Sequence, residues 1–183
     1  RRYTTPEIYR ASALNLFSRG VDGLSLFNFD YVSADLRVPM AAALRGITDL
    51  RLLRGASKDY AVYPGFGVFP AKDRKTVVVF VPDDTSKERF ARAVLRVETK
   101  QTSPDGGLAV RLNGRPLEPC AHPGAELFPP LATNAAYATR DRLAFFAVPL
   151  DRIAPGSNTV EIARTASWPK SCTLFSMELG LFK

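Results

Sequence analysis

The hydrophobic period of this sequence changes from that of helices to that of strands near residue 60. Residues 1–59 carry apolar side chains at helical spacing around one short apolar run, whereas residues 60–183 mostly alternate between apolar and polar positions. A chain of 183 residues accommodates one large domain or two small ones. We therefore predict an α+β chain with two parts, a β/α unit at 1–59 and an antiparallel β-sandwich at 60–183.

The first part opens with the signals that start and stop a helix. Thr4 or Thr5 can cap the helix, Pro6 suits its first turn, and Gly20 suits the position after its end. The apolar stripe expected on this helix consists of Tyr9, Ala13, Leu16 and Phe17. Two further short helices are expected at 39–46 and 47–55.

A short strand is predicted at 22–29, with Asn28, Asp30 and Tyr31 at its C-terminal end. Both of its faces are mostly apolar, which is typical of a parallel strand covered on both sides. One such unit cannot close a core, so we expect the neighbouring parallel strands to be missing or supplied by another chain. The chain also begins with Arg1 and not with Met, as a processed or excised piece would.

The second part has about seven strand signals at the spacing of a sandwich. Strands are expected at 76–81, 92–99, 142–150 and 158–166, and in a final run TLFSMELGLF. Asn113-Gly114 predicts a hairpin, because both turn positions of a type I′ turn require positive φ. The Gly- and Pro-rich segment 63–73 is expected to be a linker or an edge strand.

Several of these stretches resemble parts of bacterial glycoside-hydrolase-like proteins. TPEIYRASALNLFSRGVDGLSLFNFDYV resembles the last unit of their (β/α)8 barrel, and ITDLRLLRGASKDYAV is similar to the segment that leaves it. VRLNGRPLEP and FAVPLDRIAPGSNTVEI resemble the galactose-binding-like jelly roll that is appended to carbohydrate-active enzymes. The resemblance implies the C-terminal region of such a protein, with an accessory β-sandwich.

The resemblance also implies a place for the polar residues that end the predicted strand. In a barrel, Asn28, Asp30 and Tyr31 would lie at the C-terminal end of the eighth strand, beside a sugar-binding cleft. A glycosidase needs two carboxylates, and Asp30 alone is not a pair, so we expect this chain to be inactive without its full-length parent. The alternative is that these Asx residues only end the strand and begin a turn.

Trp168 lies in the loop before the last predicted strand. It is either a platform on which a sugar ring stacks or a cap of the sandwich core. With Asn28, Asp30 and Tyr31, it completes the predicted carbohydrate-binding residues.

Composition excludes several other classes. The net charge is +7, but the basic residues are scattered, so we expect no nucleic-acid partner. No apolar run is long enough to span a membrane, no signal peptide is visible, and no cofactor motif is found.

One His and two distant cysteines make a poor zinc site. Cys120 and Cys172 are either a disulfide of a secreted or periplasmic protein or two small buried side chains. Asp83-Asp84 belongs to a calcium site or to a solvated turn.

Two functions follow from these observations. The first is an accessory domain of a glycoside-hydrolase-like protein, with carbohydrate and the missing barrel segment as partners. The second is a stand-alone, non-catalytic β-sandwich module that binds glycan or protein. The neighbours of the strand at 22–29 distinguish the two.

Overall fold

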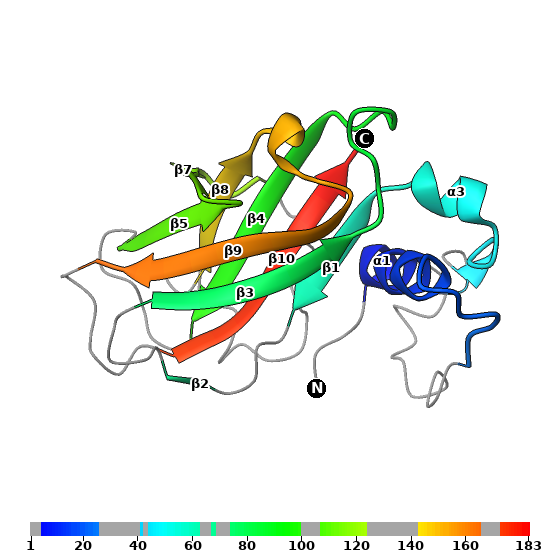
Figure 1. Cartoon of the computed structure of the whole chain (residues 1–183), viewed down its shortest axis with the longest axis horizontal. Coiled ribbons are helices and arrows are strands. Elements are labelled where there is room, and N and C mark those ends of the chain that lie inside the picture. Colours follow the sequence, from blue (N-terminus) through cyan, green and yellow to red (C-terminus); the bar gives the residue numbers. More distant parts are fainter. Residues whose placement is uncertain are drawn as a thin grey trace.

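Two antiparallel β-sheets lie face to face, with helices α1 (Pro6–Phe17) and α3 (Leu50–Arg54) at one end (Figure 1). The structure is a computed structural model that describes residues 5–25, 41, 44–62, 67–68, 74–99, 107–123, 143–165 and 173–183. This arrangement is mainly β with few helices and agrees with the predicted β-sandwich.

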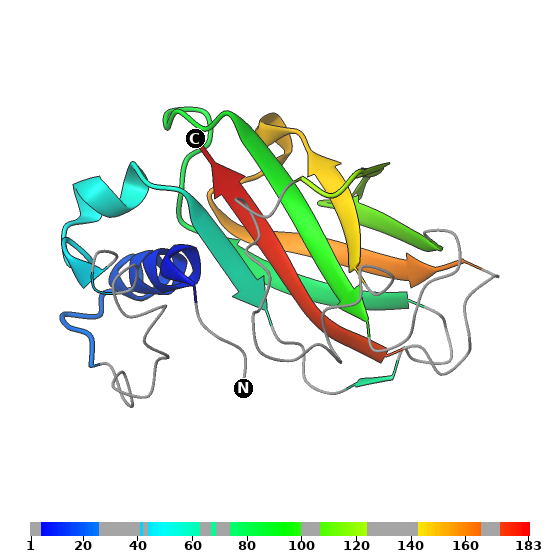
Figure 2. The same cartoon turned by 180° about the vertical axis from the view of Figure 1, so that it is seen from behind.

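The larger sheet, sheet A, has six strands in the order β1-β10-β4-β8-β7, with β2 paired to β10 (Figure 2). Its strands are β1 (Lys58–Val62), β2 (Gly67–Val68), β4 (Arg92–Thr99), β7 (Glu118–Cys120), β8 (Leu143–Val148) and β10 (Thr173–Phe182). The smaller sheet, sheet B, has the order β3-β9-β5-β6. Its strands are β3 (Arg74–Val81), β5 (Leu108–Leu112), β6 (Arg115–Pro116) and β9 (Gly156–Arg164).

The core fills the space between the two sheets and is built from every second residue of the long strands. Examples of its fully buried side chains are Val79, Leu95, Val97, Val160, Ile162, Met177 and Leu179. Because side chains alternate across a strand, the intervening residues lie on the outer faces of the sheets. In β4, this alternation turns Leu95 and Val97 into the core.

Two turns of the sandwich are fixed by asparagine. Asn113 (φ 50°) and Gly114 (φ 78°) form the predicted two-residue hairpin turn between β5 and β6. Asn158, fully buried in β9, donates to the Ala154 carbonyl at 2.7 Å and accepts from the Ala154 N–H at 2.8 Å. The Asn113 side chain also donates to Asn158 Oδ1 at 2.8 Å, so the two turns share one hydrogen-bond network.

Helix α1 (Pro6–Phe17) begins and ends where the sequence predicts. Thr5 Oγ1 accepts from the Ile8 N–H at 3.3 Å, and Gly20 adopts φ 86°. Ala13 of the predicted stripe is buried, together with Ala11 and Leu14, and Phe17 packs against this cluster. The prediction for Leu16 is wrong, because α1 turns its small residues toward β1 and toward α3 (Leu50–Arg54), leaving Leu16 exposed.

The predicted strand at 22–29 is only partly covered by the structure. Its described half, 22–25, has no regular structure and is mostly exposed, and none of the described strands pairs with it. Residues 26–29 lie outside the described residues. The shorter helix α3 agrees with the helix expected at 47–55, and no helix in the described part of the chain is long and apolar enough to cross a membrane.

Strand β1 was not predicted. It pairs with β10 over the whole of Lys58–Val62 and so runs across the predicted boundary between residues 59 and 60. The division of the chain into a barrel unit and a sandwich stays a prediction.

Candidate functional site

The carbohydrate-binding residues predicted from the sequence, Asn28, Asp30, Tyr31 and Trp168, lie outside the described residues. Their role stays a prediction. Cys172 also lies outside them, while Cys120 is half-buried at the end of β7.

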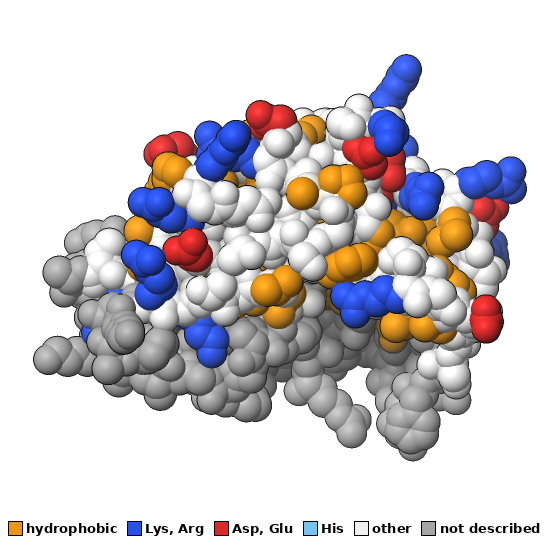
Figure 3. Space-filling view, viewed as in Figure 1, with side chains coloured by type: hydrophobic (Ala, Val, Ile, Leu, Met, Phe, Trp, Pro, Cys, Tyr) orange, Lys and Arg blue, Asp and Glu red, His pale blue; other side chains and the backbone are white. Residues whose placement is uncertain are grey.

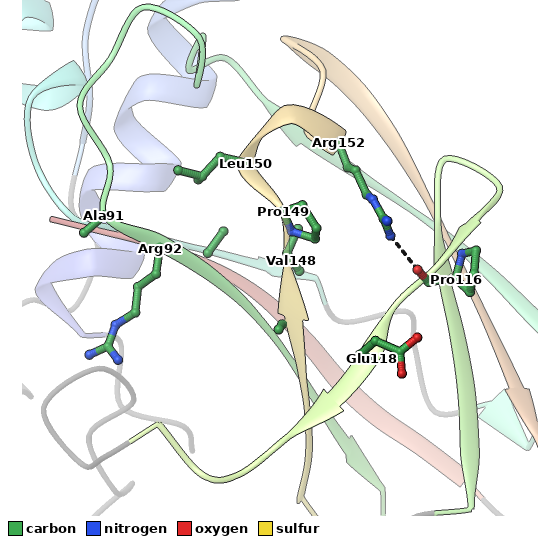
Figure 4. A pocket seen from close by; sticks show the side chains of 10 residues that line it. Ala91, Arg92, Pro116, Glu118, Val148, Pro149, Leu150 and Arg152 are labelled. Carbon is green, nitrogen blue, oxygen red and sulfur yellow. Dashed lines mark hydrogen bonds between the residues drawn. The ribbon is translucent and has the colours of Figure 1, made fainter.

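A groove of about 520 Å³ opens at one end of the sandwich (Figure 4). It is formed by the start of β4, the end of β8, the turn η4 (Leu150–Arg152), and the short strands β6 and β7. The lining residues are Ala91, Arg92, Ala93, Pro116, Glu118, Ala147, Val148, Pro149, Leu150 and Arg152. Arg152 closes one side, because its Nη1 donates to the Pro116 carbonyl at 2.6 Å.

The described lining of the groove suits polar ligands. Its lining is mainly small apolar side chains and prolines, with Arg92, Glu118 and Arg152 as the charged groups. Hydroxyl groups of a ligand can bond to these charges. Among the residues that the structure describes, the lining holds a single carboxylate and no aromatic ring, so these residues supply neither the acid pair of a glycosidase nor a ring on which a sugar stacks.

A second cluster of polar groups is buried where the helices meet the sandwich. Lys58 of β1 and Asp83, which follows β3, are both fully buried, and Lys58 Nζ lies 2.9 Å from Asp83 Oδ1. The Tyr60 O–H donates to Asp83 Oδ2. Burial lowers the pKa of the Lys58 ammonium, and the charge of Asp83 opposes that shift.

Lys58 also holds the end of helix α3. Its Nζ donates to the carbonyls of Leu53, Arg54 and Ala56, the last at 2.9 Å. The last carbonyls of a helix have no partners further along it, so one ammonium group that binds them joins the helix end to both sheets. Sequence reasoning missed this cluster. The charged pair at the start of SKDYAV, directly before a strand-forming run, is the signal that could have found it.

Neither alternative for Asp83-Asp84 describes Asp83 correctly. Asp84 forms a solvated turn, since its carboxylate accepts from the Ser86 N–H at 3.1 Å and pairs with Lys87 Nζ at 2.8 Å. These contacts lower the pKa of Asp84 to about 2. Asp83 points inward, where Lys58 and Tyr60 occupy the two oxygens that calcium would need. No group of three metal-ligating side chains gathers among the residues that the structure describes.

The outer face of sheet A carries buried charges. Arg96 of β4 pairs with Glu178 of β10, and the Ser176 hydroxyl donates to Glu98 Oε2 at 3.2 Å. Burial raises the pKa of Asp59 well above its ordinary value, and the negative charge of Glu178 raises it further. Arg96 and Glu98 lie on the face opposite the core, but they are not exposed to solvent.

Exposed apolar side chains gather at the helical end of the molecule (Figure 3). The large ones there are Leu16, Val21, Leu50 and Leu52, and Leu52 is 60% exposed. Elsewhere in the described part of the chain, the one other exposed large apolar side chain is Val78 of β3, which is 56% exposed. We call the four residues of the helical end the apolar patch.

The sequence matches no protein-family model, and no curated protein is significantly similar to it. Solved structures of glycoside hydrolase family 86 resemble part of the chain in fold. The β-porphyranase BpGH86A of the human gut bacterium Bacteroides plebeius has a TM-score of 0.46 and 14% identity, over 69% of this chain and 21% of that enzyme. BuGH86 in complex with neoagarooctaose has a TM-score of 0.41 and 12% identity, over 68% of this chain and 19% of that enzyme.

A variant of BuGH86 with the same oligosaccharide has a TM-score of 0.42 and 12% identity, over 68% of this chain and 18% of that enzyme. The chain thus spans about a fifth of the length of these enzymes. Identities this low describe a similarity of fold, while the substrates are those of the enzymes themselves.

Proposed function

We propose that the chain is the C-terminal part of a glycoside-hydrolase-like protein, in which a β-sandwich is held against a (β/α)8 barrel by the helical segment. The observation that carries the proposal is the apolar patch: large apolar side chains stay exposed on the helical end. A patch of this kind marks a surface that another unit covers. In the proposed protein, the covering unit is the rest of the barrel.

The connection between the helical end and the sandwich is suited to such a role. Strand β1 belongs to sheet A, Lys58 joins α3 to Asp83, and the Arg19 guanidinium lies 4.4 Å from the centre of the Phe80 ring in β3. These contacts fix the direction in which the apolar patch faces. A barrel that packs on the patch would therefore be held rigidly to the sandwich.

Variants of the full-length protein test this arrangement. Leu52→Glu places a charge in the proposed interface, whereas Val78→Glu places the same charge on an equally exposed apolar site of the sandwich. We expect Leu52→Glu to lower the Tm of the full-length protein and to make the junction sensitive to limited proteolysis. Val78→Glu should change neither. Equal effects of the two substitutions would show that the patch is not an interface.

The second element of the proposal is carbohydrate binding by a galactose-binding-like jelly roll, with catalysis confined to the parent. The groove supplies Glu118, Arg92 and Arg152 for hydroxyl groups, and Trp168 supplies a ring outside the described residues. Neoagarooctaose, which is bound in the two BuGH86 structures, is the first ligand to test.

Calorimetric titration of this chain with neoagarooctaose should give heat that is abolished by Trp168→Ala and weakened by Glu118→Gln. If the unchanged chain gives saturable heat and both variants give the same heat, the glycan binds to a different surface. A chain that gives no heat with neoagarooctaose or with a panel of other glycans would not be a carbohydrate-binding module, and its role would be to stabilise the barrel.

The stand-alone module is the second candidate function. The irregular, exposed conformation of residues 22–25 favours it, because a barrel strand would be buried between neighbours. In that case Leu52→Glu leaves the full-length protein unchanged, and binding of glycan or protein resides in the sandwich alone.

A further inference from the structure

We propose that Lys58 and Asp83 react to form an intramolecular isopeptide bond. The bond would join β1 of sheet A to the segment that follows β3 of sheet B, at the junction with helix α3. This proposal does not depend on the function of the sandwich.

The two reacting groups are in contact and shielded from water. Both side chains are fully buried, and Lys58 Nζ lies 2.9 Å from Asp83 Oδ1. Nζ also lies 5.3 Å from the centre of the Phe90 ring, which forms an apolar wall. Two groups held in contact react with an effective molarity far above any solution concentration.

Tyr60 and Glu88 are placed to assist the reaction. The Tyr60 O–H donates to Asp83 Oδ2, which is the oxygen that becomes negative when the amine adds to the carboxyl carbon. Burial and a hydrogen bond to Asp83 together raise the pKa of Glu88 to about 7. Glu88 can therefore carry a proton between amine and carboxyl near neutral pH.

The step balances without an added reagent. Lys58 loses a proton, and its Nζ attacks Cγ of Asp83 to form the C–N bond. The C–Oδ1 bond then breaks, and Oδ1 leaves as water with two protons that came from Nζ. An ammonium and a carboxylate become a neutral amide and one water molecule, with no oxidation or reduction.

The surroundings favour the product. A buried ion pair retains a large desolvation cost, and the amide removes both charges from the interior. The nitrogen of the amide keeps one N–H, which can still donate to a carbonyl at the end of α3, such as that of Ala56. The carbonyls that hold the ammonium thus also position the nitrogen for attack.

Intact-mass spectrometry of the denatured chain tests the proposal. We expect the chain to be lighter than its sequence by one water molecule, and digestion should give a branched peptide that joins residues 58 and 83. A chain at its full sequence mass overturns the proposal, whatever the behaviour of any variant.

Three variants assign the loss to this pair. Asp83→Asn should lose one ammonia molecule where Asp83 loses water, because the leaving group changes with the side chain. Lys58→Arg should have its full mass, and Glu88→Gln should form the bond more slowly. Glu161→Gln, which alters an exposed ion pair elsewhere, is the matched control and should show the same loss of water. A water loss that persists in Lys58→Arg would come from cyclisation of an aspartate and would overturn the proposal.

Discussion

Arg96 of β4 and Glu178 of β10 lie opposite each other in the register of sheet A and form a buried ion pair on its outer face. Sheet B carries a pair of the same two residue types, Arg74 and Glu161, which lie 3.4 Å apart on its outer face with the arginine exposed. The two pairs differ in their contact with solvent, and Arg74 lies diagonal to Glu161 in the register of sheet B. Burial makes the loss of one partner costly in the first pair and nearly neutral in the second.

Replacement of Glu178 by Gln should destabilise the protein strongly. Removing one member of a buried pair leaves the other charge without its counterion, at a cost of about 3–5 kcal/mol. Glu161→Gln is the control and should cost about 0–1 kcal/mol, as exposed pairs do. Urea denaturation of both variants measures the difference. Equal free energies of unfolding would mean that the Arg96–Glu178 pair is solvated in solution.

The stability of the protein should fall as the pH rises, and Asp59 should cause part of that fall. Its pKa is raised in the folded state by burial and by Glu178, so its contribution is fully present below the ordinary carboxyl value of about 4 and is lost as pH rises through the folded pKa. Asp59→Asn, which mimics the neutral acid, should flatten the decline of Tm measured from about pH 5 to about pH 9.

The control for this experiment is Asp151→Asn. Asp151 lies exposed in η4, so the substitution removes the same formal charge without a buried carboxyl. Its Tm should follow the wild-type curve. A slope that is unchanged in Asp59→Asn would contradict the assignment.

Asn158→Ala should destabilise the turn before β9. Its side chain bonds to both backbone groups of Ala154 and accepts from Asn113, and all of these partners would lose a bond. Buried polar groups left without partners cost about 1–3 kcal/mol. Chemical denaturation measures the effect, and the exposed neighbour Ser157→Ala should stay within about 0.5 kcal/mol of wild type. The hypothesis fails if the two variants are equally stable.

Gly114→Ala should destabilise the hairpin through its backbone alone. Gly114 has φ 78° with no atom near its missing Cβ, so the cost of about 1–2 kcal/mol comes from the left-handed conformation. Gly23→Ala is a matched control, because that site is equally open and has no positive φ. Thermal unfolding should separate the two variants, and equal Tm values would argue against the turn type.

Much of the sandwich could be predicted because its signals are local. The pattern of residues 92–99 matches the bounds of β4. Asn113-Gly114 marks the hairpin between β5 and β6, since two positive φ angles restrict the residues that fit the turn. Thr5 and Pro6 likewise mark the start of α1. Each of these features depends on a few neighbouring residues.

The missed features depend on contacts between distant residues. Lys58 and Asp59 start β1, yet two adjacent charges are typical of a loop, and their burial is possible only because Asp83 and β10 meet them in the fold. The exposed side of α1 depends in the same way on the position of β1. The predicted sugar-binding residues, from Asn28 to Trp168, lie outside the described residues, so their part of the prediction awaits the experiments above.

The position of β10 between β1 and β4 has a consequence for synthesis on the ribosome. Sheet A cannot close until residues 173–182 emerge, long after its first strand has been made. Until then β1 and β4 lack the neighbour that satisfies their backbones, and the nascent chain presents two unpaired edges. Sheet A therefore assembles late in synthesis. Until then, chaperones can bind the unpaired strands β1 and β4.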